Sequence, residues 1–157
     1  MKQLFLLACL GGIATTGTAQ FLAPAEGFTL KSGTEFFTEG LVLIPSSDLT
    51  ISSDTIRLSQ TPITATGGAS IARVYSISPS FLFSGTAGIR YTNAELNGNQ
   101  ANTLEVAFSA GNEFITLTNS TPGANFVFNT GFANTTIAAV TATNAGVALP
   151  ITLLSFT

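Results

Sequence analysis

The sequence predicts an all-β protein, an antiparallel β-sandwich of the Greek-key or jelly-roll kind, and three observations support this fold class. Apolar and polar side chains alternate over many short runs, which is the pattern of half-buried strands. Gly, Pro, Asn and Asp separate these runs at short intervals, as turn-forming residues do. Helical spacing of apolar residues is scarce, and most of the 13 Phe lie in the alternating runs, where they suit a sandwich core.

Residues 41–91 contain four segments with strand character. Residues 41–44 form a continuous apolar run closed by Pro45, which is typical of a strand covered on both faces. Residues 48–59 contain two short alternating runs around a Ser-Asp pair, which predict either a hairpin or a bend. Residues 71–77 are rich in β-branched and aromatic side chains and predict a further strand. The clearest strand spans residues 81–91, with one face formed by Phe81, Phe83, Gly85, Ala87, Ile89 and Tyr91.

The second half continues the alternation after a polar segment. Residues 93–102 are the longest polar stretch and predict a loop. Residues 104–108 and 114–118 alternate on either side of a Ser-Ala-Gly-Asn turn signal, and they predict a pair of strands joined by that turn. A Thr-Pro-Gly turn signal precedes the last alternating runs. The remaining strands are predicted at residues 126–128, 135–143 and 151–156.

The N-terminus has the three parts of a secretory signal peptide. Lys2 supplies a positive charge, and residues 4–13 form an apolar run. Small residues stand at the −3 and −1 positions before Gln20, with Ala19 as the last of them. We therefore predict cleavage between Ala19 and Gln20.

Cleavage at this point divides the chain into a signal peptide, residues 1–19, and a single β-sandwich domain, residues 20–157. The apolar run is shorter than the roughly 20 residues that span a bilayer, so no stable membrane span is expected in the mature chain. Cys9 falls within the predicted signal peptide. Its surroundings match a bacterial lipobox loosely, which leaves a lipoprotein as the alternative.

The composition excludes several classes of chemistry. The chain has no His and one Cys, which rules out Ser-His-Asp and Cys-His catalysis, imidazole metal ligands and an intrachain disulfide. Only 8% of the residues are charged, compared with about 25% in average soluble domains. The formal net charge of −3 offers no basic surface for nucleic acid. We therefore expect neither an enzyme nor a bound cofactor, metal or nucleic acid.

The acidic residues do not form a recognisable catalytic or metal-binding motif. Glu35 and Glu39 are four residues apart, roughly 13 Å along a strand, which is farther than the paired carboxylates of glycoside hydrolases. Calcium is left open as an alternative, because side-chain oxygens from separate loops can converge. The candidates for such a site are Asp48, Asp54, Glu95, Asn97 and Asn99, which turn geometry alone also explains.

The C-terminal string ALPITLLSFT, residues 148–157, resembles the LPVTLLSFTA segment that precedes type IX secretion sorting domains in secreted Bacteroidota proteins. Residues 41–51, 73–77 and 91–98 are similar to β-rich surface modules of the same group. The resemblance implies an exported β-sandwich module, located at the outer cell surface or released, of the kind associated with adhesion and surface layers. Asp54-Thr55-Ile56 also resembles the short O-glycosylation motif of this lineage, which implies Thr55 as a site of glycan attachment.

In the family the motif is followed by a sorting domain. This sequence departs from that pattern, because it stops at Thr157. It is then either a fragment of a longer chain or a subunit without that export signal, for which only the periplasm is implied. The leading hypothesis is a non-catalytic secreted structural or adhesive module. The alternatives are a self-assembling filament or sheath subunit that uses strand addition, and a polysaccharide-binding module. The candidate partners are accordingly a surface polysaccharide, another surface protein or a second copy of the chain.

Overall fold

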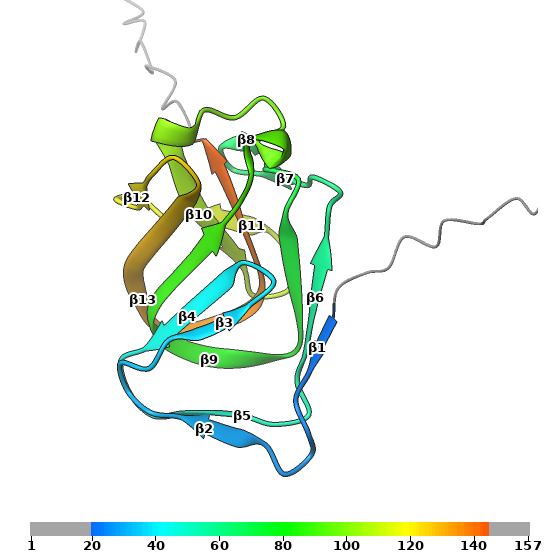
Figure 1. The fold of residues 1–157 in the computed structure, drawn as a ribbon, viewed down its shortest axis with the longest axis vertical. Coiled ribbons are helices and arrows are strands. Elements are labelled where there is room, and N and C mark those ends of the chain that lie inside the picture. Colours follow the sequence, from blue (N-terminus) through cyan, green and yellow to red (C-terminus); the bar gives the residue numbers. More distant parts are fainter. Residues whose placement is uncertain (1–19, 145–157) are drawn as a thin grey trace, which may run out of the picture.

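A computed structural model describes residues 20–144, and within them the chain is an antiparallel all-β fold, as predicted (Figure 1). The predicted signal peptide and the C-terminal segment, with its strand at residues 151–156, lie outside the described residues. The only helical segments in the described part are the short 3-10 turns η1 (Asn93–Glu95) and η2 (Ala101–Thr103). No helix in residues 20–144 has the length and apolar character that crossing a membrane requires.

The strands differ greatly in length, and two long ones organise the fold. The strands of residues 20–144 are β1 (Gln20–Leu22), β2 (Phe28–Leu30), β3 (Phe36–Thr38), β4 (Leu41–Pro45), β5 (Leu49–Ile51), β6 (Thr55–Ser59), β7 (Thr64–Ala65), β8 (Gly68–Ala69), β9 (Val74–Arg90), β10 (Leu104–Ser109), β11 (Phe114–Thr116), β12 (Thr121–Pro122) and β13 (Phe126–Asn144). The two long strands are β9 and β13.

The main sheet has the strand order β1-β6-β9-β13-β10-β11, and β4 also pairs with β9. Strand β3 extends it beside β4, and β12 pairs with β13. The start of β9 pairs with β6, whereas its end, from Gly85 to Ile89, pairs with β4. In Figure 1, β9 descends beside β6, crosses the lower part of the molecule and rises beside β4. The part of the sheet beside β6 and the part beside β4 form the two layers of the fold, and both therefore belong to one bent sheet.

Two predicted strand boundaries are wrong, because the strands continue through the bend. Residues 71–77 and 81–91 were expected to form separate strands, but β9 runs through Ser78, Pro79 and Ser80 without ending. These three residues are exposed, so they interrupt the alternation of buried side chains although strand pairing continues beyond them. The expected strands at 126–128 and 135–143 likewise merge into β13, whose pairing with β9 contains three register shifts.

The main core lies between the two layers. Phe83, Ala87, Ile89 and Tyr91 are buried in it, which confirms the predicted inward face of residues 81–91. The side chains of Leu41, Val42 and Leu43 are all fully buried, so the prediction of a strand covered on both faces is also confirmed. Burial of each such side chain stabilises the fold by about 1.5–3 kcal/mol.

The remaining local predictions are settled by strand pairing. Of the two alternatives for residues 48–59, the bend is found, because β5 pairs with β2 whereas β6 pairs with β1 and β9. Strands β10 and β11 form the predicted pair around residues 110–113. Residues 93–102 lie between β9 and β10 and contain no strand.

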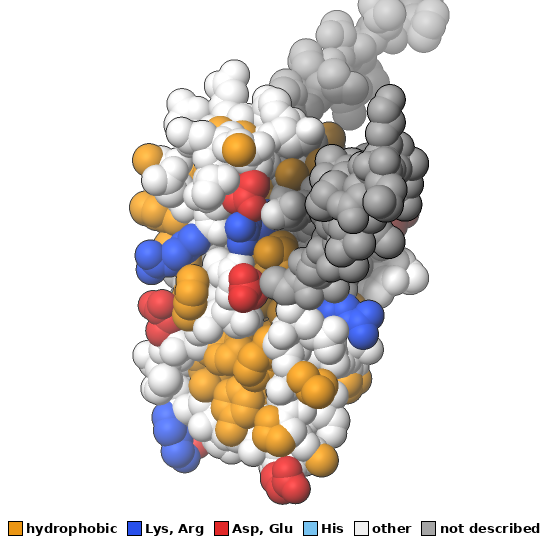
Figure 2. All heavy atoms as spheres, turned by 45° about the vertical axis from the view of Figure 1, so that its right-hand side comes forward, with side chains coloured by type: hydrophobic (Ala, Val, Ile, Leu, Met, Phe, Trp, Pro, Cys, Tyr) orange, Lys and Arg blue, Asp and Glu red, His pale blue; other side chains and the backbone are white. Residues whose placement is uncertain are grey.

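Three partly buried phenylalanines connect the main sheet with the small β2–β5 sheet. The ring centroid of Phe21 lies 6.1 Å from that of Phe28 and 5.2 Å from that of Phe36. Phe21 and Phe36 pack against both hydrophobic clusters of the protein, and Phe28 packs against the smaller one. Figure 2 shows hydrophobic side chains gathered in the lower half of one face, within a surface that otherwise carries few charged side chains.

Candidate functional site

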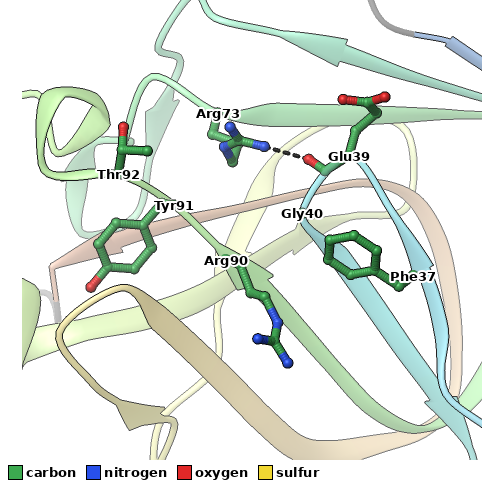
Figure 3. Close-up of a pocket in the computed structure, with 7 residues that line it drawn as sticks. All are labelled: Phe37, Glu39, Gly40, Arg73, Arg90, Tyr91 and Thr92. Atoms are coloured by element: carbon green, nitrogen blue, oxygen red, sulfur yellow. Dashed lines mark hydrogen bonds between the residues drawn. The ribbon is translucent and has the colours of Figure 1, made fainter.

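A shallow hollow of about 400 Å³ lies where the turn between β3 and β4 meets the end of β9. Its lining consists of Phe37, Glu39, Gly40, Arg73, Arg90, Tyr91 and Thr92 (Figure 3). The hollow contains two arginines, which play different parts.

Gly40 lines this hollow at a position that disfavours any side chain. Its φ of +92° is unfavourable for residues with a side chain. A Cβ atom at this position would lie 2.7 Å from Arg73 Nη1 and 2.7 Å from the carbonyl oxygen of Arg90. The Arg90 amide donates to the Gly40 carbonyl over 2.7 Å, so the turn is also bonded directly to β9. The missing side chain lets the Arg73 side chain and the Arg90 main chain approach the turn.

Arg73 belongs to a closed hydrogen-bond network, the Arg73 network, formed with Tyr75, Glu95, Thr92 and the main chain of Glu39. Its Nε and Nη2 donate to Glu95 Oε1 over 3.0 and 2.6 Å. Its Nη1 donates to Tyr75 Oη over 2.9 Å and to the Glu39 carbonyl, the contact marked in Figure 3. Tyr75 Oη donates to the same carbonyl over 2.6 Å, and Glu95 Oε2 accepts from the Thr92 amide over 2.7 Å.

The network clamps the loop after β9 against the start of β9 and the β3–β4 turn. The Arg73 and Glu95 side chains are only 15% and 12% exposed, so the ion pair is shielded from solvent. Burial by itself would lower the pKa of Arg73, but its hydrogen bonds to Glu95 and Tyr75 outweigh this effect and raise the pKa. Burial would likewise raise the pKa of Glu95, yet the hydrogen bonds from Arg73 and Thr92 hold it below its ordinary value.

Tyr75 is the third ionisable group of the network, and burial raises its pKa to about 12. All three pKa shifts move away from neutral pH, so none of these groups is poised as a general acid or base. The Arg73 network is therefore suited to holding the turn and the loop in place.

Arg90 has a different environment, on the outward side of β9. The strand register places Phe37, Val42, Gly88 and Phe128 in one row across β3, β4, β9 and β13. Residues paired across antiparallel strands share a face, and Arg90 lies on the same face as Gly88, two residues away. Phe126 is the cross-strand partner of Arg90. We call the surface formed by Phe37, Arg90, Phe126 and Phe128 the aromatic–arginine face.

Phe37, Arg90 and Phe126 are exposed and Phe128 is half-buried, and the four side chains are arranged in a definite order. Phe37 is 55% exposed and Phe126 is 38% exposed. The Arg90 guanidinium carbon lies 5.9 Å from the centroid of the Phe37 ring, within the range of a cation–π contact. Phe128 lies directly over Gly88, where an added Cβ would come within 1.8 Å of its ring. Its centroid is 5.3 Å from that of Phe126.

No carboxylate in residues 20–144 lies within ion-pair distance of Arg90. In Figure 3 the Glu39 carboxylate points away from Arg90, and Arg73 points toward the Glu39 main chain. Arg73 is fully engaged by Glu95, Tyr75 and the Glu39 main chain, so Arg90 is the cation of this hollow that is free to contact a ligand.

The sequence did not predict this face as a site. The alternation of residues 81–91 puts Arg90 on the face opposite Phe81 and Phe83, and Arg90 is indeed exposed, but the sequence assigned the phenylalanines to the core. The consecutive pair Phe36 and Phe37 was the available signal, because neighbouring strand residues point to opposite faces. One of the two had to point away from the main core.

Thr55, the predicted glycan site, is half-buried at the start of β6. It lines a second hollow of about 260 Å³ together with Arg57, Ser76 and Ser78. The neighbouring Asp54 is only 4% exposed, and its Oδ2 accepts from the Ser52 amide over 2.9 Å. Glycosylation of Thr55 stays a prediction.

The predicted cleavage site falls at the border of the described residues. Gln20 is the first residue of β1 and pairs with Arg57, whereas Ala19 lies outside the described part. The site therefore stays a prediction.

The polar residues considered for calcium make contacts within the chain instead. Asn97 and Asn99 donate from Nδ2 to the carbonyl oxygens of Ser70 and Ala69 over 2.9 and 3.1 Å. Asp48 pairs with the exposed Lys31 over 2.7 Å. Residues 20–144 contain no cluster of three or more acidic, His or Cys side chains that would hold a metal ion.

Three comparisons with known proteins gave no match. No protein-family model matches the chain, and neither a curated protein sequence nor a solved structure was found to be similar to it.

Proposed function

We propose that the chain is a non-catalytic, exported surface module that adheres to its partner through the aromatic–arginine face. The observation that carries the proposal is the exposure of Phe37 and Phe126 on either side of an arginine without a carboxylate partner. Exposed aromatic side chains that gather with a free arginine are typical of binding surfaces.

The proposal of export rests on the sequence. The signal-peptide pattern and the resemblance of residues 148–157 to the type IX-associated motif of Bacteroidota favour a location at the outer cell surface or outside the cell. Cleavage between Ala19 and Gln20 would leave all of β1 in the mature chain, because β1 begins at Gln20. The proposed mature protein therefore keeps every strand of the described fold.

The non-catalytic assignment is supported by the Arg73 network. Its ionised groups are held by hydrogen bonds within the chain and have pKa values displaced away from neutrality. The alternative of strand addition between copies gains less support, because β1 pairs with β6 of its own chain. The adhesive module is therefore the function that we favour.

The test compares two double variants as coatings on beads. We expect beads coated with the secreted protein to be retained on intact Bacteroidota cells under flow. Phe37→Ala/Phe126→Ala should lower retention at least fivefold, because it removes the exposed rings of the face. Leu82→Ala/Ile115→Ala is the control, since those side chains are 58% and 54% exposed but do not belong to the face. Equal retention of both double variants, or no retention of the unaltered protein, would refute the proposal.

A further inference from the structure

Two of the four cations in residues 20–144 lack an acidic partner. Lys31 pairs with Asp48 and Arg73 pairs with Glu95, but neither Arg57 nor Arg90 has a carboxylate within 4.0 Å. Arg90 differs from Arg57 in having an aromatic ring beside its guanidinium. It presents a planar set of N–H donors, which suit a carboxylate in a bidentate arrangement.

The aromatic–arginine face forms a strip in the order ring, cation, ring. Phe37 lies on β3, Arg90 on β9 and Phe126 on β13, which are separated by three strand spacings. At about 4.8 Å for each spacing, the strip is roughly 14 Å wide. The Gly40 carbonyl, in the β3–β4 turn, accepts from the Arg90 amide over 2.7 Å and so ties that turn to the end of β9 beside the strip. An extended ligand can therefore contact all three side chains together.

We infer that this strip binds an acidic polysaccharide, one whose sugar residues carry carboxylates. A uronic acid ring offers a face of C–H groups that packs against an aromatic ring, and its carboxylate projects from the edge of the same ring. The strip offers the complementary groups, with apolar surface at Phe37 and Phe126 and a free guanidinium between them. This inference rests on the proposed function and names the partner of the same face.

The position of the strip within the sheet favours a polysaccharide over a peptide. It crosses β4 and β9, which pair with each other from Leu41 to Pro45, so their main chains are already bonded. A peptide at this point could not add as a strand and would lose its main-chain hydrogen bonds. A polymer with repeated carboxylates needs only the side chains of the strip, and successive units can occupy it in turn.

The test is affinity electrophoresis of the secreted protein in gels that contain polygalacturonate. Gels with fully methyl-esterified polygalacturonate are the matched comparison, because esterification keeps the rings and removes the charge. The formal net charge of −3 disfavours general attraction to a polyanion, so retardation requires a local site. We expect binding to the charged polymer to be at least tenfold tighter than to the ester.

Arg90→Gln should weaken binding to polygalacturonate at least tenfold, and Phe37→Ala at least threefold. Arg57→Gln is the matched control, since it removes the other cation without an acidic partner, and it should change binding less than twofold. Both positions are exposed, and thermal unfolding of each variant checks that the fold is kept.

Three results would overturn the inference. They are no retardation by polygalacturonate, equal binding to the charged and esterified polymers, and equal losses for Arg90→Gln and Arg57→Gln. A fourth overturning result comes from gels that contain poly-glutamate. Binding to poly-glutamate as tight as that to polygalacturonate would show that the sugar rings contribute nothing. If any of these occurs while Phe37→Ala/Phe126→Ala still lowers bead retention, the adhesive function stands and only the ligand class is wrong.

Discussion

Replacement of Glu95 by Gln tests the role of the Arg73 network in the stability of the fold. Gln keeps the size of the side chain but removes the charge that balances Arg73, which is only 15% exposed. It also places a donor near the Thr92 amide, which now donates to Glu95 Oε2 over 2.7 Å. Removal of one partner from a buried ion pair costs about 3–5 kcal/mol. The residual exposure of this pair reduces the expected loss to about 2–4 kcal/mol.

Urea unfolding at pH 7 measures this loss directly. With a slope of about 1.5–2 kcal/mol per molar urea, the unfolding midpoint should fall by roughly 1–3 M without a change in slope. Asp48→Asn is the matched control, because the Lys31–Asp48 pair is 76% and 52% exposed. It should shift the midpoint far less, since exposed pairs contribute little to stability.

The stability difference between wild type and Glu95→Gln should also change with pH, in a direction that the pKa of Glu95 sets. Because the pKa of Glu95 is lowered in the folded protein, the stability from its ionised form is complete above its ordinary value of 4.5. This contribution is lost as the pH falls through the folded pKa, so the gap between wild type and Glu95→Gln should narrow in acid. A variant as stable as wild type at pH 7, or a gap that stays constant down to pH 3, would refute the structural role of the pair.

Three further outcomes follow from particular residues. Gly40→Ala should destabilise the protein by about 2–4 kcal/mol in thermal unfolding, because it adds a close contact with Arg73 to an unfavourable φ. Gly33→Ala, at a φ of +76° with open space around it, should cost only about 1–2 kcal/mol, and an equal loss at both positions would contradict this explanation. In an ultraviolet absorbance titration Tyr75 should ionise near pH 12, so a phenolate step near pH 10 that Tyr75→Phe removes would refute its burial. Peptide mass mapping of the secreted protein should find Thr55 glycosylated, and unmodified peptide alone would reject that assignment.

The sequence was sufficient where a local pattern fixes the environment of a side chain. The alternation of residues 81–91 identified the buried face because strand side chains point to opposite sides in turn. The continuous apolar run at residues 41–44 identified a strand covered on both faces for the same reason. Exposed Ser78 and Ser80 ended that local pattern, so the sequence could not show that β9 continues through the bend.

The candidate site depends on contacts between residues far apart in the chain. Arg73 meets Glu95, 22 residues later, and both residues occur in segments without a distinctive charge pattern. Phe37 and Arg90 meet only because β3 and β9 flank β4 in the sheet. Strand order is a property of the whole fold, and period-2 alternation contains no information about it.

The sequence by itself thus determined the all-β class, most of the strand positions and the shortage of catalytic side chains, because each depends on composition or local alternation. Only the tertiary structure decided that the two layers belong to one bent sheet and that Arg73 is paired whereas Arg90 is not. The physical reason is that pairing energies act between strands distant in sequence. The same alternation that predicts a buried face is compatible with several strand orders, and packing selects one of them.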